Sequence, residues 1–146
     1  MRYCRILFIL PILVALVSIA KADPKFYAVF KKEYLDKHPD KKFAEAVNKA
    51  DVRCLVCHQG KKLKKNRNSL GHELAKFLDR KKDLKDDKKI AESIKKVLAM
   101  HVDPKNDKSE TYMDRLKASK WPGGELEELK KEPKGEPGKE TPEAGN

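Results

Sequence analysis

The stretch Cys54-Leu55-Val56-Cys57-His58 decides most of what this chain can be. Two residues separate the cysteines, so a single turn of backbone can place both thiols along one edge of a flat ring system, and the imidazole follows at once. This is the spacing at which two thiols add to the vinyl groups of haem while the histidine binds the iron. We therefore predict one covalent haem c, attached through Cys54 and Cys57, with His58 as the proximal iron ligand.

Three rival interpretations of the cysteines remain open. In an oxidising compartment the pair could form a disulfide. A structural zinc site needs four ligands. The cysteine pair supplies two and His72 or His101 could supply a third, but the chain has no second Cys-x-x-Cys motif to complete the site. A thioredoxin-type dithiol is expected in a βαβ context, whereas helical periodicity precedes this motif. The histidine directly after the second cysteine favours haem attachment over all three.

The N-terminus has the pattern of a signal peptide. Residues 1–5 carry two arginines, residues 6–19 are almost entirely apolar, and Ala20-Lys21-Ala22 offers small residues at a cleavage site. The apolar run is shorter than the ~20 residues that span a bilayer. We predict cleavage after Ala22, a periplasmic or secreted protein, and no stable membrane insertion afterwards; the alternative is an uncleaved anchor.

Composition and periodicity predict one small all-α domain. Charged residues make up 39% of the 146-residue chain, so its apolar core is small and a buried porphyrin would help to complete it. No stretch alternates apolar and β-branched residues as a strand would. Five stretches have helical periodicity with capping signals: 24–38, 40–58 (a stripe that continues through Cys54 to Cys57 and His58), 68–78, 86–102 and 109–121.

The composition changes after Gly124 to Glu, Lys, Pro and Gly. Leu126 and Leu129 could support one helical turn, but from Pro133 onward no residue is suited to burial, which is typical of a disordered tail. The chain therefore divides into three predicted parts: a signal peptide (1–22), a haem domain (23–124) and a C-terminal tail (125–146).

Two segments resemble known proteins. CLVCHQGKKLKKNRNSLGHELAKFL (54–78) and WPGGELEELKKEP (121–133) are similar to small lysine-rich secreted cytochrome c-like proteins of planctomycete-type bacteria, and the order of helices resembles a class I cytochrome c domain. The resemblance implies an all-α fold in which the first and last helices pack across each other with the haem in the middle. It also implies an extracytoplasmic location and electron transfer. Only Cys54, Cys57 and His58 carry over as site residues.

The distal iron ligand is less well specified, because the class I pattern of a methionine beside prolines in a long loop is not clearly present. Met100 lies near the end of the fourth predicted helix and before the fifth, where such a ligand is expected, and is our choice. His101, on the same helix face, is the alternative, and an open sixth position is a third possibility. Met113 and His72 fit better as a core residue and a solvated residue.

A basic segment follows the haem histidine and must lie near the haem edge. We interpret it as a docking face for an acidic redox partner, with a merely solvated loop as the alternative. Export and the lack of interleaved aromatic residues argue against nucleic-acid binding. Its members are Lys61, Lys62, Lys64, Lys65 and Arg67.

The function predicted from these features is that of a monohaem electron carrier that catalyses no bond chemistry. No paired carboxylates or Ser/His/Asp constellation indicates an enzyme. Two alternatives stay open: a five-coordinate haem enzyme or a sensor of gas or peroxide, and a secreted structural protein with a disulfide and no haem.

Overall fold

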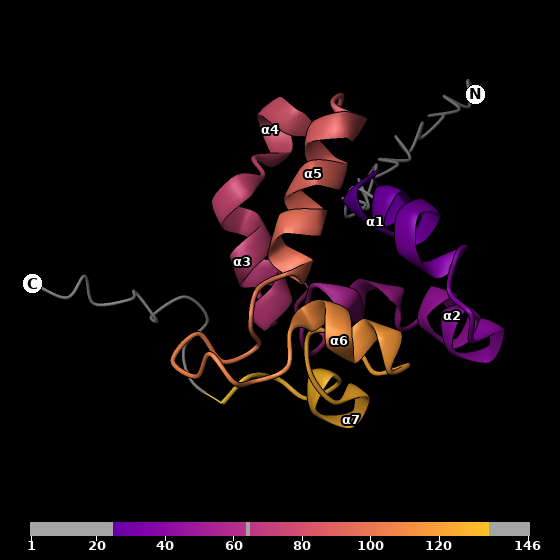
Figure 1. The fold of residues 1–146 in the computed structure, drawn as a ribbon. Coiled ribbons are helices and arrows are strands. Elements are labelled where there is room, and N and C mark those ends of the chain that lie inside the picture. Colours follow the sequence, from indigo (N-terminus) through magenta and orange to yellow (C-terminus); the bar gives the residue numbers. More distant parts are fainter. Residues whose placement is uncertain (1–24, 64, 135–146) are drawn as a thin grey trace, which may run out of the picture.

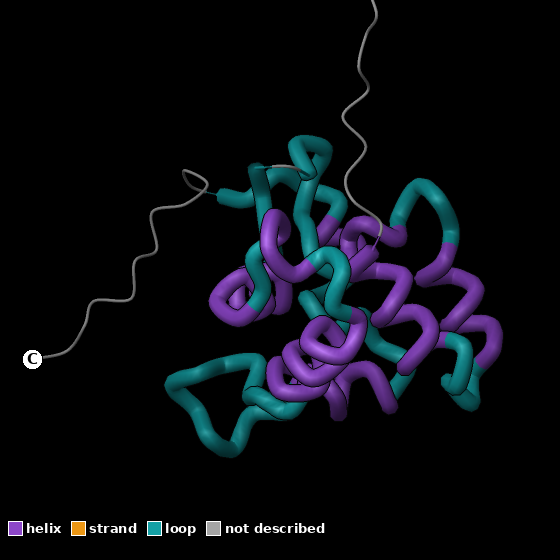
Figure 2. Tube along the Cα trace, turned by 90° about the horizontal axis from the view of Figure 1, so that it is seen from above, coloured by secondary structure: helices purple, strands orange, loops and turns teal. Residues whose placement is uncertain are grey.

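The computed structural model describes residues 25–63 and 65–134, so the predicted signal peptide, Lys64 and the end of the predicted tail lie outside it. The described residues form helices and loops without a β-strand, which confirms the all-α class (Figures 1 and 2). The elements are α1 (Lys25–Phe30), the π-helical turn η1 (Lys31–Leu35), α2 (Lys41–Asn48), the 3-10 turn η2 (Arg53–Val56), α3 (Ser69–Phe77), α4 (Arg80–Asp83), α5 (Asp87–Leu98), α6 (Tyr112–Lys117) and α7 (Leu126–Leu129).

Three helices are capped by the residues with which the predicted ranges 40–58, 68–78 and 86–102 begin. The side chains of Asp40, Asn68 and Asp86 each accept a backbone N–H from the first turn of α2, α3 and α5. Such a cap satisfies one of the backbone donors that the first turn of a helix leaves unpaired. These short polar residues therefore fix where the three longest helices start.

The second predicted helix is wrong in one respect that matters for the site. It does not continue through Cys54 to Cys57: α2 ends at Asn48, and Lys49 leaves the helical region with ψ 140°. Ala50, which the periodic stripe placed on the buried face, is exposed. The motif instead lies on the separate turn η2. The short helix α4, capped by Asp79, was not anticipated.

The main core surrounds α5. Figure 1 shows α3 and α5 side by side with α4 joining them at one end, and α1 on another side of α5. Ile90, Ile94, Val97 and Leu98 of α5 are fully buried, as the helical periodicity predicted. The first helix thus packs mainly against α5 rather than against the last helix. Within the described part of the chain, no helix combines the length and apolar character needed to cross a bilayer.

A second, smaller core extends the folded region beyond the compositional boundary at Gly124. Leu129 of α7 is only 3% exposed and packs with Val52 and Leu55, the latter from the motif itself. The packed region therefore reaches past Gly124 into what composition marks as tail. Residues 135–146 lie outside the described range.

Candidate haem attachment site

The three motif residues lie on one tight turn. Cys54 is in η2, Cys57 is its C-cap, and His58 follows. The backbone N–H groups of Cys57 and His58 both donate to the carbonyl of Cys54, at 3.3 and 3.0 Å, so the turn wraps around that carbonyl. Both cysteines are half-buried free thiols. The local fold therefore keeps the two thiols and the imidazole within five consecutive residues of compact backbone.

The imidazole of His58 is held by one of its two nitrogens. Its Nδ1 lies 3.0 Å from the carbonyl oxygen of Asn66, and the backbones of His58 and Arg67 form an antiparallel bridge. With the proton on Nδ1, that nitrogen donates to the carbonyl and Nε2 keeps a lone pair. Burial lowers the pKa of His58 against the opposing effect of the Asn66 hydrogen bond, so the ring is neutral at pH 7. A neutral imidazole fixed through its other nitrogen is the usual form of a metal-binding histidine.

Asn68 organises the loop that carries the motif, residues 54–68, which we call the attachment loop. Its side-chain Nδ2 lies within 2.8, 3.0 and 3.3 Å of the carbonyl oxygens of Leu55, Val56 and His58. Its Oδ1 accepts the N–H of Gly71, and its backbone N–H donates to the carbonyl of Cys57. One buried amide thus caps α3 and satisfies carbonyl groups along the motif turn.

Two glycines let α3 and the chain after Trp121 approach the attachment loop. A Cβ on Gly71 would lie 1.9 Å from the carbonyl oxygen of Cys57, and a Cβ on Gly123 would lie 2.2 Å from Nδ2 of Asn68. Neither distance leaves room for a methyl group. Both glycines belong to the two segments on which the family resemblance depends. The structure brings those segments into contact through Asn68, and Ser69 also donates to the carbonyl of Gly123.

The chemistry of the donor set fits a covalent haem. Burial raises the pKa of the Cys57 thiol to about 12, so it is a protonated thiol at neutral pH. Two S–H groups with an adjacent neutral imidazole are the groups that thioether formation and iron binding require. Within residues 25–63 and 65–134, no three His, Cys, Asp or Glu side chains come together as a metal-ion site.

The two main distal candidates, Met100 and His101, follow the end of α5 in the chain. Met100 is half-buried and packs against the main core, which Cys57 also contacts. His101 is exposed, and its Nδ1 lies 2.5 Å from the carbonyl oxygen of Ser109. Met113 is half-buried against the same core, as expected, and His72 is exposed. The structure thus brings the proximal residues together on one turn and places Met100 on the core that this turn contacts.

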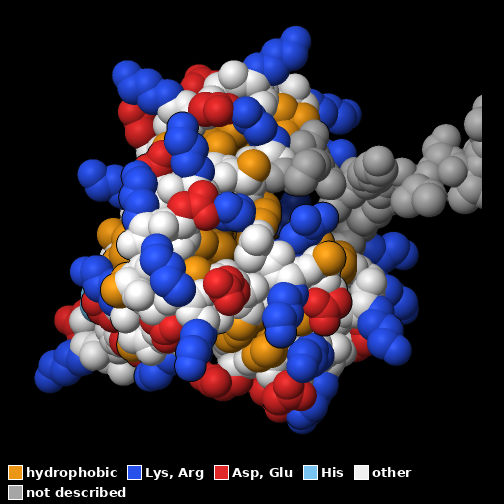
Figure 3. All heavy atoms as spheres, turned by 90° about the vertical axis from the view of Figure 1, so that its right-hand side faces the viewer, with side chains coloured by type: hydrophobic (Ala, Val, Ile, Leu, Met, Phe, Trp, Pro, Cys, Tyr) orange, Lys and Arg blue, Asp and Glu red, His pale blue; other side chains and the backbone are white. Residues whose placement is uncertain are grey.

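The basic segment lies on the surface next to the site. Lys61, Lys62, Lys65 and Arg67 are exposed. The face drawn in Figure 3 shows lysine and arginine side chains dispersed among acidic ones rather than gathered in one patch. Along the chain, the segment after His58 has four described basic residues and no acidic residue between positions 59 and 67.

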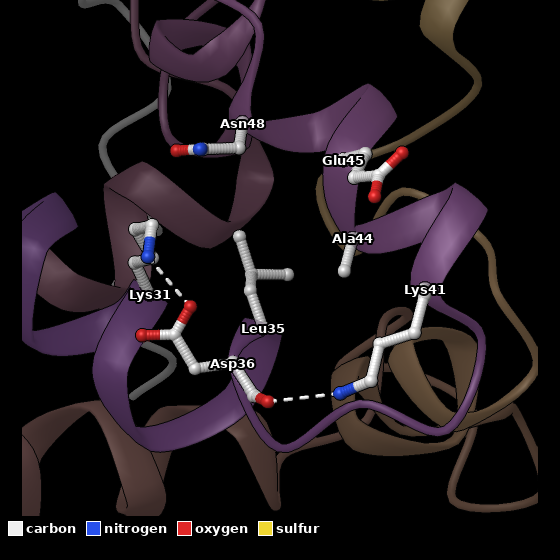
Figure 4. Close-up of a pocket in the computed structure, with 7 residues that line it drawn as sticks. All are labelled: Lys31, Leu35, Asp36, Lys41, Ala44, Glu45 and Asn48. Carbon is white, nitrogen blue, oxygen red and sulfur yellow. Dashed lines mark hydrogen bonds and ion pairs between the residues drawn. The ribbon is translucent and has the colours of Figure 1, made fainter.

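Two surface pockets lie away from the motif. One, of about 200 Å³, is formed between η1 and α2, where Asp36 accepts hydrogen bonds from Lys31 through its side chain and from Lys41 through its carbonyl (Figure 4). The other, of about 250 Å³, lies beside His38 and is lined by Met113. Neither is lined by Cys54, Cys57 or His58.

Sequence reasoning missed the residues that hold the attachment loop in place. Asn68 was recognised only as a possible helix cap, and Gly71, Gly123 and Asn66 carried no signal of their own. Their contacts join segments that are far apart along the chain, which periodicity and local spacing do not report. Searches of protein-family models, curated proteins and solved structures found no match to this chain.

Proposed function

We propose that this chain is an extracytoplasmic monohaem c-type cytochrome that carries single electrons between redox partners. The observation that carries the proposal is the state of His58: its Nδ1 is engaged by the Asn66 carbonyl 3.0 Å away, and its neutral ring directly follows two free thiols on one turn. A structural disulfide would have no need of an imidazole fixed in this way.

The roles of the residues follow from their chemistry. Cys54 and Cys57 would each add S–H across a vinyl double bond, which forms a thioether without net oxidation. His58 would bind iron through Nε2 while the Asn66 carbonyl fixes the plane and basicity of the ring. Asn68 holds the backbone between these groups, so their relative positions change little. When bound, the haem supplies the one-electron ferric/ferrous couple.

Met100 is the distal ligand that we favour. It is half-buried on the core that Cys57 also contacts, whereas His101 is exposed and tied to the Ser109 carbonyl. A thioether opposite histidine raises the reduction potential relative to a second histidine.

The exposed basic residues after His58 supply the partner surface. Lys61, Lys62, Lys65 and Arg67 would steer an acidic partner toward the haem edge, and the attraction would weaken with salt because exposed charges are screened over roughly 10 Å at ~0.1 M ionic strength. Charge reversal at several of these positions should slow electron transfer and flatten its dependence on ionic strength. Unchanged rates with a physiological partner would favour a merely solvated loop.

The decisive experiment is export of the full chain in cells that contain a cytochrome maturation system, followed by a pyridine haemochrome assay on the denatured protein. We expect one covalent haem per chain. Cys54→Ala or Cys57→Ala should weaken covalent attachment, and His58→Ala should change the Soret spectrum and the iron coordination.

His72→Ala is the matched control, because His72 is an exposed histidine on α3 and should leave all spectra unchanged. A wild-type chain without covalent haem would overturn the proposal. A high-spin, five-coordinate iron in the wild type would instead favour the enzyme or sensor alternative.

A further inference from the structure

The chain after α7 crosses the attachment loop, and we propose that residues 128–132 form a clamp in which Glu132 is a positioning residue for His58. The role of His58 as an iron ligand rests on the proposed function; the clamp itself does not. The clamp lies entirely in the region that composition assigns to the tail.

The first part of the clamp is apolar and backbone contact. Leu129 is buried against Leu55 of the motif, and its carbonyl accepts the N–H of Gly60 at 2.7 Å. The side-chain amide of Gln59 donates to the carbonyl of Glu128 at 3.3 Å. These contacts hold α7 against the two residues that directly follow His58.

The second part is the Glu132 carboxylate, which joins the two ends of the basic segment. Oε1 accepts a hydrogen bond from the backbone N–H of Lys61 at 2.9 Å, and Oε2 accepts one from the side-chain Nδ2 of Asn66 at 2.6 Å. The carbonyl of the same Asn66 binds Nδ1 of His58. Hydrogen bonds to a carboxylate are stronger than those between neutral groups, so Glu132 fixes Asn66, and Asn66 fixes the imidazole.

The environment of Asn66 makes it dependent on Glu132. Asn66 is 3% exposed, and its Oδ1 is the one buried side-chain oxygen or nitrogen without a partner among the described residues. Among the described residues, Glu132 is thus the only side-chain partner of this amide, and its loss would leave both polar atoms of the amide unpaired. Gly60 allows the approach: its φ is +68°, and a Cβ there would lie 2.8 Å from Cδ of Glu132.

The test compares Glu132→Gln with Glu127→Gln in the full exported chain. Glu127 is an exposed carboxylate of α7 whose contact is an ion pair with Lys130, so it matches the change in charge and position without touching the loop. Limited trypsin digestion is followed by mass spectrometry. The measured quantity is the cleavage rate at Lys61, Lys62, Lys65 and Arg67 divided by the rate at Lys95 and Lys96 of α5.

Glu132→Gln should raise this ratio several-fold, and Glu127→Gln should not. A general loss of stability raises both rates and leaves the ratio unchanged, so unfolding does not imitate the result. Glu132→Asp keeps the charge but shortens the side chain by one methylene, and its ratio should fall between those of wild type and Glu132→Gln. An unchanged ratio in both Glu132 variants would overturn the clamp.

In protein that carries haem, the ferric EPR g values report the orientation and hydrogen bonding of the axial imidazole. They should shift in Glu132→Gln and stay unchanged in Glu127→Gln. A raised cleavage ratio with unchanged g values would overturn the positioning role. If the chain binds no haem, the proposed function fails, while the digestion still decides whether the clamp exists.

Discussion

The attachment loop and the segment between α5 and α6 (residues 99–111) are both long and polar, but they are held in different ways. The attachment loop is bound by residues far along the chain, up to 71 positions away in the bond from Lys61 to Glu132. The α5–α6 segment is closed by bonds within itself and its flanks: Val102 to Glu110, Tyr112 to Met100, and His101 to Ser109.

This difference between long-range and local bonds predicts that the two sides of the proposed haem differ in rigidity. The attachment loop, which would form the proximal side, is held by the protein alone, because buried amides and close glycine contacts determine its backbone. The segment in which we propose the distal ligand is closed by local bonds, and such closure opens at low cost in free energy. We therefore expect mutations in the two regions to differ in size even when the residue type is the same.

The largest effect should come from ending the chain after Gly124. This removes the clamp bonds and the buried side chain of Leu129. The loss of Leu129 alone should lower the free energy of unfolding by about 2–5 kcal/mol, as a Leu→Ala change in a core does. The attachment loop would then be held locally, like the α5–α6 segment. Urea unfolding of the full chain and the truncated chain measures the loss.

The matched control ends the chain after Lys134. Everything described in the second core is then kept, and the free energy of unfolding and the haem content should be nearly unchanged. Equal stability of the two truncated chains would show that α7 contributes nothing.

The next largest loss of stability is expected at Asn68, and Asn106 in the α5–α6 segment is its comparison. Asn68→Ala removes a helix cap and the amide donor near three motif carbonyls, so we expect a loss of about 2–4 kcal/mol from the cap and the unpaired buried groups together. Asn106→Ala removes an exposed side chain that accepts only the N–H of Lys108, and should cost about 0.5 kcal/mol or less. Chemical denaturation of both variants checks the prediction; similar losses would contradict the contrast between the regions.

A smaller effect on stability, but a visible one on the iron, is expected at the distal side. Met100→Ala should cost about 1 kcal/mol, less than for a fully buried methionine, because the side chain is half-buried. In haem-loaded protein it should abolish the far-red charge-transfer band of sulfur ligation and lower the reduction potential. If His101→Ala is instead the variant that converts low-spin to high-spin iron, the protein has two histidine ligands.

The smallest effect is a pH dependence at the end of the α5–α6 segment. Asp114 forms a capping box with Thr111, and hydrogen bonds from the Thr111 backbone and then its hydroxyl lower the pKa of Asp114 below the ordinary 3.8. Its stabilising contribution is present above that ordinary value and is lost as the pH falls through the lowered pKa.

Asp114→Asn should therefore be less stable than wild type at pH 7, with the difference shrinking toward pH 2. Unfolding curves across this range, with Asp107→Asn as an exposed control, test the prediction. A difference that does not change with pH would mean that the capping box does not depend on the charge.

The sequence was informative wherever the determinant was local. The caps at Asp40, Asn68 and Asp86 and the buried stripe of α5 depend on neighbours within a few residues, and both are confirmed. Haem attachment through the equally local Cys-x-x-Cys-His spacing stays a prediction. Local reasoning also had a signal that it did not use: Thr111 and Asp114 have the spacing of a capping box, but the helix start was placed near Ser109.

Non-local determinants could not be predicted in the same way. Helical periodicity continued through Ala50 toward Cys57, yet the backbone leaves the helix at Lys49. The helical turn at Leu126 and Leu129 was indicated and is present as α7, but the charged composition after Gly124 concealed the burial of Leu129, because a single buried leucine hardly changes a composition. The contact of Gly71 with Cys57 depends on how two segments pack, and nothing in either segment alone predicts it.

The sequence separation of the clamp also has a kinetic consequence. Bonds between residues some seventy positions apart require closure of a large loop, and the entropic cost of closure must be met before such contacts contribute. During folding, the turn around the Cys54 carbonyl, whose bonds span three or four residues, can therefore form well before Glu132 arrives. During that interval, the thiols lie on a turn that already has its native local geometry but is not yet covered by the clamp.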